Sequence, residues 1–160
     1  MILMRKVSLF KLTLILAACS VIAGCFLDDN GSSNSNGEVN VAGTWTGPVK
    51  VNSCSPSDVC NQAGFQQGQT FNAVLTLQQN GSNVNGKYTC QGANISADVS
   101  GTISGSNLTL NGTVNNPFGR ATVAFAGKVN NSSMDSTVSH DVTLFDGRSG
   151  TVSGSGTFTR

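Results

Sequence analysis

From Val41 to Arg160, apolar and polar residues alternate, and Gly, Asn, Ser or Pro interrupt the alternation about every eight to twelve residues. Successive side chains of a strand point to opposite faces, so this period predicts half-buried β-strands joined by turns. No stretch has the spacing of an amphipathic helix. The pattern predicts strands at Thr44 to Val51, Thr70 to Gln79, Asn83 to Gln91, Ile95 to Ile103, Asn107 to Val114, Arg120 to Val129, Met134 to His140 and Ser149 to Thr159.

One face of the predicted strands is apolar and carries no Asp, Glu, Lys or Arg, whereas the other combines Thr, Ser, Asn and Gln with charges. Eight short sequential strands with one apolar face predict an all-β, antiparallel up-and-down barrel, because closure removes exposed strand edges. The apolar face comprises Trp45, Val49, Val51, Phe71, Ala73, Leu75, Leu77, Val84, Tyr88, Cys90, Ile95, Ala97, Val99, Ile103, Leu108, Leu110, Val114, Val123, Phe125, Val129, Met134, Val138, Val152 and Phe158.

Alternation alone does not say which face is inside. A membrane-spanning barrel would turn its apolar face to lipid, enclose a polar lumen and carry two aromatic girdles. The polar face here has few charges, and the chain has one Trp and one Tyr. We therefore expect the apolar face to line the interior.

Glycines also fall on the apolar face, where they let strands coil sharply and keep a small barrel from overfilling. The alternative is that they leave a cavity for a ligand. These residues are Gly47, Gly86, Gly101, Gly112, Gly127, Gly154 and Gly156.

Before the barrel, basic residues lead into the apolar stretch "LTLILAACSVIAG", which has the length and flanks of a secretory signal. Its end, "IAGC" at residues 22–25, resembles the lipobox of bacterial lipoproteins. The resemblance implies that the Cys25 thiol receives a diacylglyceryl group and that cleavage follows Gly24. An ordinary signal peptide and an uncleaved anchor helix are the alternatives.

Lipidation would divide the chain into a signal peptide at 1–24, a lipidated cysteine with a disordered tether at 25–40, and a barrel domain at 41–160. The tether is rich in Gly, Ser and Asn, which cannot bury enough apolar surface to order it. In Gram-negative lipoproteins an Asp after the cysteine favours inner-membrane retention. Phe26 stands there, so we expect a cell-envelope protein, held at the outer membrane if the source is Gram-negative.

Removal of the signal also changes the charge. Six basic and eight acidic residues follow position 24, a formal net charge of −2. No basic patch is available to neutralise phosphates, so nucleic acid is not an expected partner.

The segment Gly43-Thr44-Trp45 resembles the G-x-W start of the first strand in lipocalin-like barrels, and a long first loop follows it, as in that family. The family's T-D-Y motif is missing between the sixth and seventh predicted strands. Arg160 is only a weak counterpart of the arginine that packs on the family's tryptophan. G-x-W also begins avidin-like barrels, but their biotin sites are lined by several Trp.

Connections of an up-and-down barrel alternate between its two ends. Short turns at Asn80 to Asn83, Ser104 to Ser106 and Asn130 to Ser133 alternate with longer connections at Asn52 to Gln69, Gly92 to Asn94, Asn115 to Gly119 and Asp141 to Arg148. The tether joins the tight end, so we expect the loop-rich mouth to face away from the membrane. Its expected exposed binding residues, each of which could instead be a plug or loop filler, are Phe65, Phe118, His140 and Phe145.

Three cysteines remain after Cys25. Cys54 and Cys60 lie in the first loop, and Cys90 ends a strand at the same mouth. The oxidising compartment favours a disulfide. Either loop cysteine could pair with Cys90, or the two with each other, leaving one thiol free.

No enzyme motif, cofactor loop or metal signature is found. A zinc site of three Cys and His140 would need a C-x₅-C spacing outside the usual range. Ser139, His140 and Asp141 are strand neighbours that cannot converge as a triad. We expect no metal, no cofactor and no catalysis.

The sequence favours a non-catalytic binding module that holds a small apolar ligand in the barrel or an envelope protein at its mouth. The alternative is a packed-barrel inhibitor or surface-interaction lipoprotein.

Overall fold

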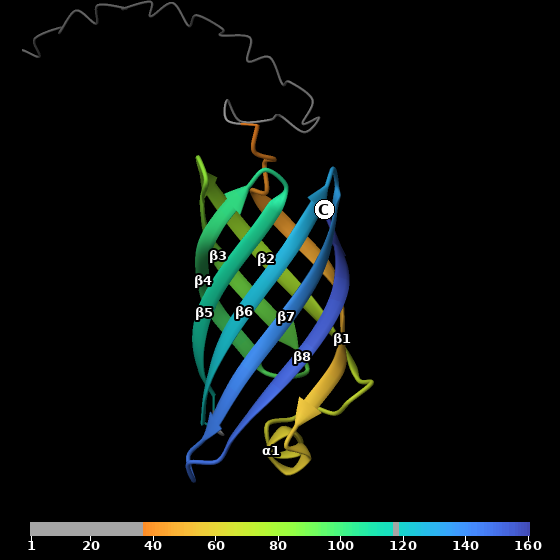
Figure 1. The fold of residues 1–160 in the computed structure, drawn as a ribbon, viewed down its shortest axis with the longest axis vertical. Coiled ribbons are helices and arrows are strands. Elements are labelled where there is room, and N and C mark those ends of the chain that lie inside the picture. Colours follow the sequence, from red (N-terminus) through yellow and green to blue (C-terminus); the bar gives the residue numbers. More distant parts are fainter. Residues whose placement is uncertain (1–36, 117–118) are drawn as a thin grey trace, which may run out of the picture.

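The computed structural model describes residues 37–116 and 119–160. The interpretations of Gly24, Cys25 and Phe118 lie outside this range. In the described chain the strands form a closed antiparallel barrel in sequence order (Figure 1). The elements are β1 (Gly43–Ser55), α1 (Ser57–Gln62), β2 (Thr70–Asn80), β3 (Asn83–Gln91), β4 (Ile95–Ser104), β5 (Asn107–Asn116), β6 (Gly119–Asn130), β7 (Ser133–Leu144) and β8 (Ser149–Thr159).

Barrel closure comes from pairing of the first and last strands, with Thr46 opposite Thr159 and Cys54 opposite Val152. All other pairs join consecutive strands. The predicted all-β, eight-stranded up-and-down barrel is therefore confirmed.

Several strands run further toward the loop-rich end than predicted. β7 continues to Leu144, and β5 and β6 pair as far as Asn116 opposite Gly119. The connections expected at 115–119 and 141–148 are therefore shorter than predicted. The mouth carries a single long connection, between β1 and β2.

The predicted apolar face lines the interior, and every hydrophobic side chain assigned to it is buried. The glycines of this face serve close strand packing rather than a cavity. A Cβ at Gly86 or Gly101 would collide with the backbone carbonyl of Thr76 or Thr109 on the neighbouring strand. Glycine is required at these points because the backbones approach too closely for a side chain.

The tight end is covered by the segment before β1. Val41 is fully buried, and its carbonyl accepts a hydrogen bond of 2.9 Å from the Trp45 indole N–H. The Arg160 guanidinium lies over the Trp45 ring at 4.7 Å and donates to the Ala42 carbonyl at 3.2 Å. Val39 also packs on the core. The first and last described segments thus meet at one pole (Figure 1).

The opposite pole carries α1, which the sequence did not predict (Figure 1). The helix has six residues, fewer than two turns, so no repeat of 3.6 is visible in the sequence. Val59 and Cys60 are its buried residues, and Asp58 lies in its first turn. In the described part of the chain, no helix is long and apolar enough to cross a membrane.

Candidate functional site

The α1 end of the barrel is held to β1 by a disulfide between Cys54 and Cys60. The pairing of β1 with β8 shifts register between Val51 and Ser53. This bulge adds a residue to the strand and turns Cys54 toward the barrel interior, where Cys60 meets it. The open question of pairing is settled in favour of the two loop cysteines. Cys90 is buried and free.

The chain after α1 folds back into the mouth at Phe65. Gly64 has a φ of +85°, a conformation that glycine adopts without strain. The Phe65 N–H then donates to the Cys60 carbonyl at 2.8 Å, which closes the helix end. Phe65 is 3% exposed, and so it is a plug for the mouth.

Beneath the plug lies a cluster of aromatic rings. Phe65 stacks on His140 with ring centroids 5.5 Å apart and meets Phe71 edge-on at 5.6 Å. Tyr88 lies on the other side, 5.9 Å from His140. The cluster joins the β1–β2 connection to β2, β3 and β7.

Phe65 and His140 are buried rather than exposed, and of the two readings left open for Phe65 the structure favours the plug. His140 shares the inner face of β7 with Val138 and Val142 and is 4% exposed. The strand continues past His140 to Leu144, so His140 lies inside the barrel rather than at its rim. Its neighbour Asp141 is exposed and accepts a hydrogen bond from Thr151.

The cluster encloses an interior void of about 10 Å³, roughly the space of one water molecule. Of the buried polar atoms near it, His140 Nδ1 has no hydrogen-bond partner, and the Tyr88 hydroxyl interacts with the Cys90 thiol. Burial lowers the pKa of His140 to about 4 and raises the pKa of Tyr88, because both charged forms lose their hydration. Burial also raises the pKa of the Cys90 thiol. All three groups are neutral at pH 7.

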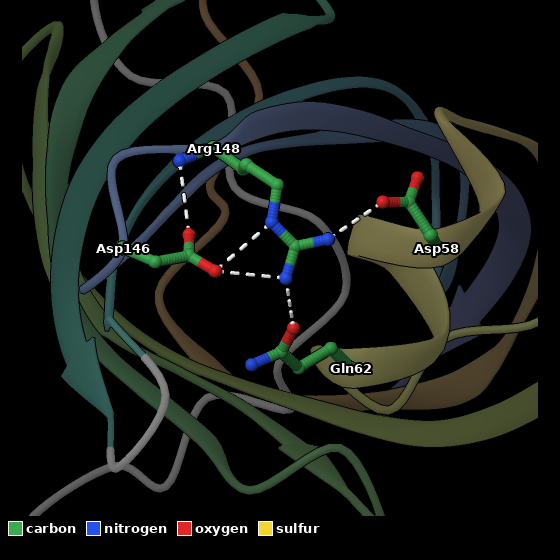
Figure 2. A network of polar contacts seen from close by, with 4 residues as sticks. All are labelled: Asp58, Gln62, Asp146 and Arg148. Carbon is green, nitrogen blue, oxygen red and sulfur yellow. Dashed lines mark hydrogen bonds and ion pairs between the residues drawn. The ribbon is translucent and has the colours of Figure 1, made fainter.

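The outside of α1 is braced by Arg148, from the turn between β7 and β8 (Figure 2). Its guanidinium reaches Asp58 and Gln62 of α1, both at 2.6 Å, and Asp146 of its own turn at 2.8 Å. Hydrogen bonds from Arg148 lower the pKa of Asp146. Sequence reasoning missed this network, because its two halves are 86 to 90 residues apart.

Phe145 belongs to the same turn as Asp146 and Arg148. It is 81% exposed, and no other large hydrophobic residue of the described chain is exposed. Phe145 is one of the residues predicted at the mouth, and its side chain is exposed in the turn between β7 and β8. Beside α1, an open hollow of about 260 Å³ is lined mainly by polar residues: Cys54, Ser57, Cys60, Asn61, Phe65, Gln66 and Gln67.

A second depression lies on the barrel wall. It has a volume of about 430 Å³ and is lined by small or uncharged residues of β1 and of β5 to β8, including Ala124, Ala126 and Thr137. Within the described residues, no group of three or more His, Cys, Asp or Glu side chains is placed to hold a metal ion.

Comparison with known proteins gives no match to any family model, curated protein or solved structure.

Proposed function

We propose that the chain is a lipid-anchored, non-catalytic envelope lipoprotein with a packed barrel that presents its α1 end to a protein partner. The lipobox resemblance at residues 22–25 supports the anchor. The Trp45 and Arg160 contact supports a lipocalin-like barrel, because it pairs the G-x-W tryptophan with an arginine from the chain's other end.

The packed interior favours a protein partner over a small ligand. The void under Phe65 is about 10 Å³, whereas pockets for small ligands measure about 300–1,000 Å³. Among the described residues, the tight end is covered by Val41 and the mouth by Phe65. A lipid-sized molecule would need both the core and a plug to rearrange.

The observation that carries the proposal is Phe145. An exposed aromatic side chain on an ordered turn loses little conformational freedom on binding, and the cores of protein interfaces are enriched in aromatic residues, Phe among them. The turn is ordered by Arg148, which bonds to Asp146 and also to α1. The anchor attaches at the N-terminal side, so this turn would face away from the membrane.

Site-specific photocrosslinking in the native host tests this proposal. A photoreactive phenylalanine analogue replaces Phe145 in one chain and Thr122, an exposed residue on the β6 wall, in the control. We expect one discrete protein adduct from position 145 and none from position 122. No adduct at 145, or equal adducts at both positions, would contradict the proposed surface.

Metabolic labelling of the same cells with a fatty-acid analogue tests the anchor separately from the surface. The parent chain should incorporate the label and the Cys25→Ser chain should not, because the acyl chains would be attached through the Cys25 thiol. A parent chain without label would contradict the anchor proposal even where the adduct at position 145 forms.

A further inference from the structure

Three polar side chains face the small void beneath the Phe65 plug. Tyr88 and Cys90 come from β3, and His140 comes from β7 on the other side of the interior. Their exposed fractions are 0%, 3% and 4%. A thiol and an imidazole therefore share one enclosed space of about 10 Å³.

The Nδ1 atom of His140 makes no hydrogen bond within the fold. That atom is buried and has no partner, whereas the Tyr88 hydroxyl interacts with the Cys90 thiol. Buried polar atoms are nearly always partnered, and an unpaired one costs free energy. A ligand that accepts the Nδ1 lone pair would remove this cost.

Cys90 is available to such a ligand. Cys54 and Cys60 are bonded to each other, which leaves Cys90 as the free cysteine of the described chain. Its burial raises its pKa, and the burial of His140 lowers the imidazole pKa. The site thus offers a protected thiol, whose thiolate selects soft ions such as Cu(I), and a neutral imidazole, which also suits copper.

We propose that Cys90 and His140 bind one soft monovalent metal ion, of the Cu(I) or Ag(I) class, inside the barrel. The metal–sulfur bond forms as the thiol proton leaves to solvent. One monovalent cation, one thiolate and one neutral imidazole carry no net charge. A divalent ion on the same two ligands would leave a positive charge in an apolar interior, which is unfavourable.

The test uses Ag(I), which needs no reductant and so leaves the Cys54–Cys60 disulfide intact. The full chain carries Cys19→Ser and Cys25→Ser, so that Cys90 is its free thiol. Native mass spectrometry and calorimetry should show one Ag(I) per chain. Absence of uptake at one equivalent would overturn the proposal.

Two variants and a matched control assign the ligands. Cys90→Ala and His140→Phe should each lose the stoichiometric ion, and the phenyl ring keeps the stack between Phe65 and Tyr88. Met134→Leu removes another buried sulfur, one that does not line the void, and should bind as the parent chain does. Retained binding in His140→Phe would overturn the proposal and leave the void as a water site only.

X-ray absorption at the silver edge gives a readout that needs no variant. The parent chain loaded with one Ag(I) should show one sulfur and one nitrogen neighbour. Two sulfur neighbours, or none, would contradict the assignment even if the variants failed to fold.

Discussion

At the scale of single residues, His140 shows how burial changes chemistry. The imidazole lies between Phe65 and Tyr88, and the nearest charged side chain in sequence, Asp141, points to the outer face. Desolvation dominates, and so the folded protein binds the His140 proton only near pH 4, whereas the unfolded chain binds it at about pH 6.5.

This difference predicts loss of stability in mild acid. Between pH 6.5 and pH 4 the unfolded state holds more protons, so the free energy of unfolding falls as pH falls. The full loss is about 3 kcal/mol at 1.36 kcal/mol for each pKa unit. Urea denaturation at pH 7.0 and pH 4.5 measures most of this loss, because pH 4.5 still lies above the folded pKa of about 4. The His140→Phe variant should lack most of this slope, and an unchanged slope would show that another group titrates.

The inward face of each strand was predictable residue by residue, because a barrel wall forces strict alternation. The burial of His140 and of Phe65 was not predictable in this way. His140 was placed at a strand end, but two more inward positions follow it on β7. Phe65 lies in a connection, and its burial depends on the turn at Gly64 and on α1, neither of which leaves a periodic signal.

At the scale of elements, the strands were located well and α1 was missed. The bounds of β3 and β8 were predicted to the residue, because turn residues or the chain end flank them. The predicted bounds of β5 and β7 end too early, because polar residues near the mouth resemble loop sequence. The Cys54–Cys60 bridge was one of three open pairings, and the bulge after Val51 that selects it has no sequence signature.

The contacts of Arg148 with α1 predict a local rather than a global effect on stability. Arg148→Ala removes bonds to Asp58 and Gln62, which are exposed and therefore contribute little to overall stability. We expect the melting temperature to change little and amide exchange in α1 to become about two- to fivefold faster. Hydrogen-exchange mass spectrometry measures this, with Lys87→Ala on the β3 wall as the control. Equal exchange in both variants would mean that the disulfide alone holds α1.

At the scale of the whole molecule, close strand packing decides stability. Ala at Gly101 would place a methyl group against the backbone of Thr109 and Leu110, which cannot move without opening the sheet. Ala at Gly127 would meet mainly the Met134 side chain, 2.6 Å from its sulfur, which can change rotamer. We expect Gly101→Ala to cost about 3 kcal/mol or more and Gly127→Ala about 1 kcal/mol.

Chemical denaturation of the two glycine variants checks this order. Similar losses would show that the strands can separate slightly at Gly101, and that the barrel is less tightly wound than its backbone geometry indicates.

The contact between the first and last strands has a consequence for how the protein is made. Arg160 bonds to Ala42 across 118 residues of chain, and β8 supplies the second neighbour of β1. During synthesis, β1 therefore keeps one unpaired edge until β8 emerges. Such an edge can pair with other chains, and contacts this distant in sequence form slowly. The newly made chain is thus most prone to aggregation just before β8 is available to pair.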